Sequence, residues 1–299
     1  MTTTYTNLVD EVLLNLSGYT MRQDRSTHLT ADVTSSGTTI NIDSTTSIGK
    51  GIIEIDEELI WLDTYDRVSS SASIPPYGRG FQGTVAAAHT SGTKVSIAPT
   101  FPKSTVKKAI NDTIGAVFPS LFGVGVTTFT LTPTQTTYAL PAEAYTILAA
   151  SWSVVGPSKE WLPIKSWRHD KVANSTSFPT GNTISVYDGI TPGRTIQVFY
   201  AKEPSFMTSN SDVFETVTGL PDSTRDVIAY GAAYRLASFV DPGRLTYTSA
   251  EADNADTKIQ YGAGASTARF LLALYQERLN NESAKLRNTY PFRPHYTRY

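Results

Sequence analysis

Four acidic residues stand close together in the sequence, at Glu54 and in the run Asp56-Glu57-Glu58. A convergent pair of carboxylates can perform general acid–base hydrolysis, and carboxylate oxygens can also hold a calcium-type cation. A cation loop needs acids spaced so that the chain wraps around the ion, whereas consecutive acids at a hairpin tip point in different directions. We therefore expect a solvated turn here, and these acids are the clustered candidates for a hydrolase.

The run Gly78-Arg79-Gly80-Phe81-Gln82-Gly83 matches the G-x-G-x-x-G fingerprint of dinucleotide-binding proteins. That fingerprint requires a buried strand before it, a helix opening at the third glycine and an acid about 20 residues further on. Here Pro75 and Pro76 precede the run, and Lys103 stands where the acid is needed. The run therefore predicts a Gly-rich turn within a β module, and no nucleotide or other cofactor is expected.

The histidines and tryptophans carry no further catalytic pattern. The sequence has no Cys, and its four histidines are separated from one another, at His28, His89, His169 and His295. None has a metal-ligand spacing or lies beside a nucleophile elbow, so we expect no catalytic residue, no metal ligand and no enzyme. Trp152, Trp161 and Trp167 are predicted to pack a β core, with a sugar-binding surface as the alternative.

The end of the chain has an unusual composition. Residues 285–299 contain no acid, and they interleave basic residues with Tyr290, Phe292, Tyr296 and Tyr299. Pro291 and Pro294 keep the preceding helix from continuing, so the tail is expected to be extended. Aromatic and Arg side chains are enriched at protein interfaces, and the same combination of basic and aromatic residues is suited to binding single-stranded nucleic acid. From the residues alone, three possibilities remain for the tail: it binds a partner protein, it packs against its own domain, or it binds nucleic acid.

The composition excludes several classes of protein. The hydrophobic fraction of 40% supports a packed core, and 25 Lys plus Arg against 27 Asp plus Glu give a net charge of −2. Broad binding to phosphate backbones is a poor expectation at that charge. No apolar run approaches the roughly 20 residues of a membrane span, and the first residues resemble no secretory signal. We expect a strand-rich protein without a membrane partner.

Helical and β-strand patterns alternate along the sequence, and they predict which elements position the residues named above. Apolar residues recur at helical spacing near residues 4–16, 102–119, 221–241 and 267–287. Short β-type runs fill residues 29–98, including a hairpin of Gly51–Ile55 with Leu59–Leu62, and residues 127–201. Four amphipathic helices cannot bury their apolar stripes alone, because helices draw most of their stability from tertiary packing.

The predicted fold class is α+β, with a discontinuous helical bundle, two inserted β modules and an extended C-terminal tail. The expected boundaries are 1–28 for the first bundle helix, 29–99 for a small β module, 100–123 for the second bundle helix, 124–217 for a β-sandwich or barrel, 218–287 for the C-terminal bundle helices and 288–299 for the tail.

Three separated stretches of the sequence resemble the head-to-tail adaptor, or connector, proteins of tailed double-stranded-DNA bacteriophages. The opening Tyr5–Thr20 is similar to their first helix, and Tyr275–Leu279 with Tyr290–His295 to their last helix and tail. In the middle, Gly78–Thr84, Ala86–His89 and Pro102–Pro119 resemble their β module and second helix.

This resemblance implies a structural virion protein located in the neck between head and tail and assembled in the host cytoplasm. It implies a homo-oligomeric ring, a dodecamer, that joins the portal protein to the next neck or tail component and touches double-stranded DNA transiently in its channel. The tail would then bind the portal through Arg287, Tyr290, Phe292, Arg293, His295, Tyr296, Arg298 and Tyr299. A fibre, baseplate or minor tail protein that binds host carbohydrate is the alternative.

Overall fold

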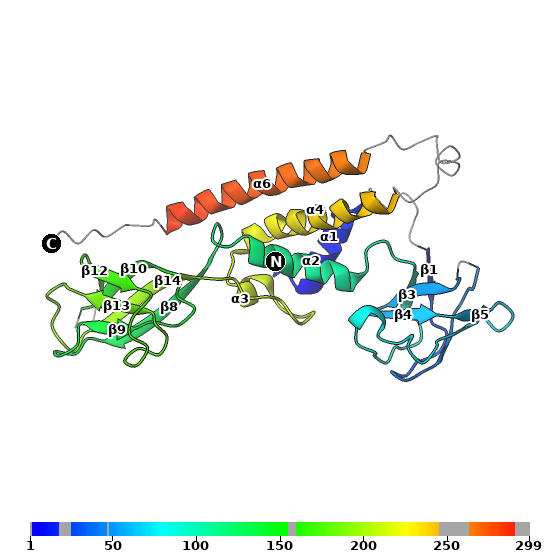
Figure 1. The fold of residues 1–299 in the computed structure, drawn as a ribbon, viewed down its shortest axis with the longest axis horizontal. Coiled ribbons are helices and arrows are strands. Elements are labelled where there is room, and N and C mark those ends of the chain that lie inside the picture. The colour runs from blue at the N-terminus through cyan, green and yellow to red at the C-terminus, as the bar shows by residue number, and fades with distance from the viewer. Residues whose placement is uncertain (1, 18–24, 47, 155–159, 245–262, 291–299) are drawn as a thin grey trace. The chain divides into compact units, whose positions relative to one another are not determined.

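The computed structural model describes residues 2–17, 25–46, 48–154, 160–244 and 263–290 (Figure 1). The chain divides into two compact units, each assembled from separated segments. Unit 1 contains Met1–Tyr5, Thr113–Val227 and Tyr275–Tyr299, and unit 2 contains Thr6–Asp112 and Ile228–Leu274.

Unit 2 is built around two antiparallel sheets. One sheet has the order β1 (Arg25–His28), β7 (Lys94–Ile97), β3 (Gly51–Ile55) and β4 (Glu58–Leu62). The other has the order β2 (Thr39–Asn41), β6 (Ser71–Ser73) and β5 (Thr64–Asp66). The hairpin predicted from sequence is confirmed, since β3 pairs with β4 in a register that sets Ile53 opposite Ile60. Buried Ile, Leu and Val side chains from both sheets form one core cluster.

The first two predicted helices are confirmed. Helix α1 covers Tyr5–Asn15, where the expected range was 4–16, and Leu8 and Val12 on its stripe are fully buried. Helix α2 covers Lys103–Ala116 and buries Val106 and Ile110. In both helices the apolar residues at helical spacing are those that the protein removes from water.

Unit 1 holds the second pair of antiparallel sheets. The larger has the order β11 (Trp161–Pro163), β10 (Thr146–Ser153), β14 (Thr195–Lys202) and β8 (Gly123–Thr130). The smaller has the order β12 (Trp167–Asp170), β13 (Thr183–Val186) and β9 (Thr137–Ala139). Trp167 is buried in the core and Trp152 packs against it, as predicted, whereas Trp161 is 42% exposed, so the core prediction is wrong for that residue.

Helical structure returns after β14. The elements are α3 (Phe214–Thr218), the 3-10 turn η3 (Asp222–Thr224), α4 (Arg225–Arg244) and α6 (Ala263–Thr289). Gly219, at φ 72°, ends α3 in the left-handed conformation that favours glycine. Helix α4 continues through Pro242, beyond the predicted end near 241, and α6 begins at Ala263, before the predicted start near 267.

The prediction of a discontinuous helical bundle with inserted β modules is wrong. The described residues form four antiparallel sheets and five helices, and about 30% of them are helical. Helices α2, α4 and α6 each contribute residues to both compact units, so they do not make up a separate helical domain. An apolar stripe shows that one side of a helix is buried, but it does not show whether a helix or a sheet covers that side.

Within the described ranges, no helix combines the length and the apolar character that a membrane span requires.

Candidate assembly surfaces

The four clustered acids make contacts at three places in unit 2. Glu54 Oε1 accepts a hydrogen bond of 2.6 Å from the backbone N–H of Lys103, the first residue of α2, where a carboxylate complements the helix dipole. Glu57 lies 2.5 Å from the ammonium of Lys107. Asp56 and Glu58 both contact His89. Asp56 and Glu58 contact opposite nitrogens of the His89 ring, and the other two acids contact different residues, so these carboxylates do not form the convergent pair that hydrolysis requires.

Glu58 corrects the expectation of a solvated turn. It is the first residue of β4, and only 2% of its surface is exposed. Arg79 donates to both carboxylate oxygens, from Nε at 2.7 Å and from Nη2 at 2.8 Å. The backbone N–H groups of Gly80 and Ala87 donate to the same carboxylate at 2.9 and 3.0 Å. A buried carboxylate is tolerated when its lone pairs are satisfied in this way.

These bonds also determine the charge of Glu58. Burial by itself raises the pKa of the carboxyl, but the hydrogen bonds from Arg79, Ala87, Gly80 and His89 outweigh it and lower the pKa to about 2. The group is therefore ionised at neutral pH and carries no proton to give. A general acid needs a pKa near the working pH, so Glu58 holds structure in place and does not act as an acid.

His89 connects the turn between β3 and β4 to the end of the Gly-rich segment. Its Nδ1 lies 2.8 Å from Asp56 Oδ2 and its Nε2 lies 2.9 Å from Glu58 Oε2, and the residue is 3% exposed. Each ring nitrogen therefore faces one carboxylate oxygen, so both sides of the imidazole are used in contacts within unit 2. Its backbone also pairs with Val33 in an isolated bridge, which fixes the ring in position.

The Gly-rich run is a turn, as the sequence predicted, and it covers the edge of β4. The backbone N–H of Trp61 donates to the carbonyl of Gly78 at 2.8 Å, and that of Leu59 donates to Thr84 Oγ1 at 3.0 Å. A Cβ on Gly78 would lie 2.6 Å from the carbonyl oxygen of Trp61, so only glycine permits this approach. The 3-10 turn η2 (Phe81–Gly83) completes the segment, and no helix opens at Gly83. The segment lacks the helix N-terminus on which a dinucleotide phosphate would sit.

The predicted portal-binding residues lie at the C-terminal end. Arg287 is exposed in the last turn of α6, and Tyr290 is half-buried, with its N–H donating to the carbonyl of Leu286 at 2.8 Å. The other predicted residues are Phe292, Arg293, His295, Tyr296, Arg298 and Tyr299, which lie outside the described residues.

Polar contacts within unit 1 hold the helix that leads into this tail. Arg278 donates to Asp226 at 2.8 Å, and Ser223 donates to the buried Glu282 at 2.9 Å. Lys285 adds an ion pair of 2.5 Å with Glu282, one turn before the last residues of α6. The start of the tail is therefore fixed by bonds to the beginning of α4 and to the turn before it.

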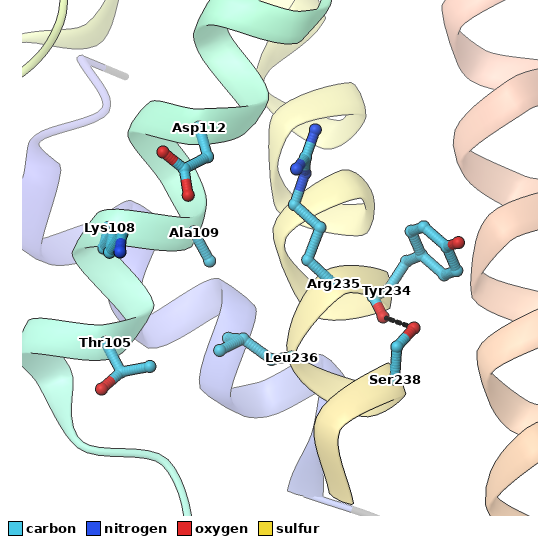
Figure 2. A pocket seen from close by; sticks show the side chains of 8 residues that line it. All are labelled: Thr105, Lys108, Ala109, Asp112, Tyr234, Arg235, Leu236 and Ser238. Carbon is cyan, nitrogen blue, oxygen red and sulfur yellow. Dashed lines mark hydrogen bonds between the residues drawn. The ribbon is translucent and has the colours of Figure 1, made fainter.

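A groove between α2 and α4, within unit 2, has a cavity volume of about 540 Å³ (Figure 2). Its lining residues are Thr105, Lys108, Ala109, Asp112, Tyr234, Arg235, Leu236 and Ser238. The hydroxyl of Ser238 donates to the carbonyl of Tyr234 within α4, as Figure 2 shows. The charged side chains in the groove are two cations and one carboxylate. No local pattern indicates this groove, because the residues of its two walls are more than a hundred positions apart in the sequence.

The histidines do not assemble a metal or catalytic site in the described parts of the chain. His28 and His89 belong to unit 2, His169 belongs to unit 1, and His295 lies outside the described residues. No group of three His, Asp or Glu side chains with the arrangement of metal ligands occurs within the described residues. Burial and the nearby Lys171 lower the pKa of His169, which favours the neutral ring.

A family model described as SU10 adaptor protein matches residues 90–287, which is more than half of the chain. The match begins directly after His89 and includes α2, both sheets of unit 1, α4 and most of α6. It confirms the resemblance to phage head-tail adaptors that the sequence suggested. No curated protein matches the chain in sequence.

Proposed function

The chain belongs to the SU10 adaptor protein family, and we propose that it forms a homo-oligomeric ring in the phage neck, a dodecamer, that joins the portal protein to the next neck or tail component. In this proposal the ring assembles in the host cytoplasm and lets double-stranded DNA pass through its channel. The family supports the coarser role of a structural, virion-associated adaptor that contacts other virion components.

The family match over residues 90–287 is the observation that carries the proposal. The clustered acids also favour a structural role, because Glu54, Glu57 and Glu58 are used in helix capping, in an ion pair and in a buried network. The small net charge of −2 suits a channel wall along which DNA must slide without binding.

The tail is the proposed contact with the portal. Aromatic side chains provide large apolar area, and Arg can pair with acidic groups on a partner surface. The contacts of α6 with Asp226 and Ser223 would keep the tail's starting point in place during docking. A fixed starting point reduces the conformational entropy that the tail loses on binding.

Deletion of residues 288–299 tests this assignment. We expect the shortened protein to keep its circular dichroism spectrum and thermal midpoint and to be missing from purified phage particles. A second variant keeps the length of the tail but replaces its aromatic and Arg residues by Ser, which separates the effect of chemistry from the effect of length. Normal incorporation of either variant into particles that retain DNA would contradict the portal contact.

The alternative of a fibre or baseplate protein that binds host carbohydrate draws some support from the exposed ring of Trp161. The family match and the helical content of about 30% favour the adaptor. A Trp161→Ala variant separates the two functions, because it should abolish adsorption to host cells only if the ring binds a sugar.

A further inference from the structure

The groove between α2 and α4 is lined mostly by polar side chains. Six of its eight lining residues carry a charge or a hydroxyl group, and only Ala109 and Leu236 are apolar. Its volume of about 540 Å³ lies within the range of ligand pockets, but pockets for small molecules are lined mainly by hydrophobic and aromatic groups. A polar groove of this size is better suited to a segment of a protein, which brings its own hydrogen-bonding groups.

The two cations of the groove have no carboxylate partner among the described residues. Lys108 is exposed on α2 and Arg235 is half-buried on α4, and neither side chain forms an ion pair or a hydrogen bond there. The neighbouring Lys107, by contrast, pairs with Glu57 at 2.5 Å. A half-buried guanidinium loses part of its hydration without gaining a partner, so a carboxylate supplied from outside would replace what it has lost.

Asp112 is the third charge of the groove, and it restricts what can bind. It follows Lys108 by one helical turn on α2, while Arg235 extends from α4 (Figure 2). The phosphates of DNA carry negative charge and no hydrogen-bond donor, so Asp112 would only repel them. A peptide meets the same carboxylate with backbone N–H groups, which donate to it. The charges of the groove therefore complement a peptide with acidic side chains.

We propose that this groove binds an acidic segment of a partner protein, whose carboxylates pair with Arg235 and Lys108 while its backbone N–H groups donate to Asp112. The proposal goes beyond the ring and the tail contact and depends on neither. The tail of a neighbouring copy does not fit the groove, because residues 285–299 contain no acid. Arg235 offers a planar pair of donors that matches a carboxylate, which is the basis on which Arg-containing sites recognise acidic motifs.

Titration of the full, isotopically labelled chain followed by nuclear magnetic resonance tests the proposal. The probe is an acetylated and amidated Glu-Gly-Glu-Gly-Glu peptide, and the matched control is the same peptide with Gln in place of Glu. The acidic peptide should shift the amide signals of lining residues such as Ala109 and Leu236, with a dissociation constant of about 1 mM. The Gln peptide should not shift them. No shift with the acidic peptide, or equal shifts with both peptides, would overturn the proposal.

Substitutions show whether the cations carry the binding. Arg235→Gln should weaken binding of the acidic peptide about tenfold, because it removes charged hydrogen bonds, and Lys108→Gln should weaken it about threefold. Lys94→Gln, on β7, should leave the affinity unchanged. Lys108 and Lys94 are both exposed, so these two variants can be compared even if Arg235→Gln disturbs folding. Unchanged affinity in Lys108→Gln would overturn the proposal.

Other occupants of the groove give different results. Inorganic phosphate or a short DNA duplex that shifts the lining signals as strongly as the acidic peptide would overturn the proposal. Lining signals that shift with protein concentration would assign the groove to a second copy and would overturn it as well. The combined replacement Glu251→Gln, Asp253→Asn and Asp256→Asn removes acids that follow α4 in the sequence, and it should leave the affinity unchanged. A severalfold gain in affinity would show that the chain itself supplies the acids, which would overturn the assignment to a partner.

Discussion

The guanidinium of Arg79 meets the carboxylate of Glu58 at two points, with nitrogen–oxygen distances of 2.7 and 2.8 Å. The Glu58 side chain is 1% exposed and that of Arg79 is 10% exposed. The remaining guanidinium hydrogens reach the backbone carbonyls of Thr34, Gly37 and Ala87. One side chain therefore connects β4 to the turn at Thr34–Gly37 and to the segment at Ala87, so its loss should disturb several parts of unit 2 at once.

Replacement of Arg79 by Met should destabilise the protein by about 3–5 kcal/mol, because it leaves a buried carboxylate without its partner. Chemical denaturation at pH 7 measures the change. Lys50→Met is the matched control, since the Lys50–Asp63 pair is exposed on both sides and its loss should cost under about 1 kcal/mol. Equal effects of the two substitutions would show that burial adds nothing to the Glu58–Arg79 pair.

The lowered pKa of Glu58 predicts a loss of stability in acid. Its pKa falls from an ordinary 4.5 to about 2 in the folded protein, so the unfolded chain binds the proton more readily. The stabilisation is fully present above pH 4.5, and it disappears as the pH falls toward 2, with a total of about 3 kcal/mol.

The comparison with Arg79→Met isolates Glu58 from the other carboxylates. The difference in unfolding free energy between the parent and this variant should narrow steadily between pH 4.5 and pH 2, because protonation removes the charge that Arg79 compensates. Denaturation curves over that range measure the difference. A difference that stays constant with pH would contradict the assignment of the low pKa to this pair.

Thr84→Val should leave the edge of β4 without one of the hydrogen bonds that cover it. The substitution keeps the shape of the side chain but removes the oxygen that accepts the N–H of Leu59 at 3.0 Å. An unpaired backbone donor costs about 1–3 kcal/mol and offers a site for strand addition. Light scattering during slow heating should show earlier aggregation. Thr84→Ser keeps the oxygen and should behave as the parent, so aggregation of both variants alike would contradict the role of the hydroxyl.

Gly125→Ala should strain the core of unit 1. A Cβ at this position of β8 would lie 2.3 Å from Cζ of Tyr200, whose ring is 4% exposed and whose hydroxyl donates to Glu143 at 2.7 Å. Overpacking of this kind costs about 1–3 kcal/mol. Gly189→Ala is the control, because no atom lies within 4 Å of its added Cβ.

Coupling to Tyr200 provides the sharper readout. Because Tyr200→Leu removes the ring that Gly125 accommodates, the cost of Gly125→Ala should be smaller in that background than in the parent. Thermal unfolding of the two single variants and the double variant measures this interaction energy. Strict additivity would indicate that the clash is relieved by movement of the strand and not by the ring.

Local patterns in the sequence predicted the parts of the fold that depend on near neighbours. The hairpin of β3 and β4, the helix α1 and the Gly-rich turn are confirmed because their signals lie within a few residues of each other. The prediction of the fold class was wrong, because the surfaces that cover the apolar side of each helix come from segments that are distant in the sequence. The portal-binding residues stay a prediction, since most of them lie outside the described part of the chain.

The burial of Glu58 was missed although the sequence carried a signal for it. Side chains on a strand alternate between its two faces, so Glu58 lies on the same face as the buried Ile60 and Leu62. The acidic run suggested a turn instead, because no local pattern shows that Arg79 lies 21 positions later, or His89 31 positions later, at the same place. A buried acid needs such partners, and only the tertiary structure supplies them.

The cover of the β4 edge also influences how the chain folds while it is being made. Thr84 follows Leu59 by 25 residues, so a ribosome adding roughly 5–20 residues per second completes the cover about 1–5 s after the strand. The loop closes faster than this, because contacts over short sequence separations form in microseconds. The edge and its cover are therefore synthesised within a few seconds of each other, long before the residues of unit 1 that follow Thr113 are complete.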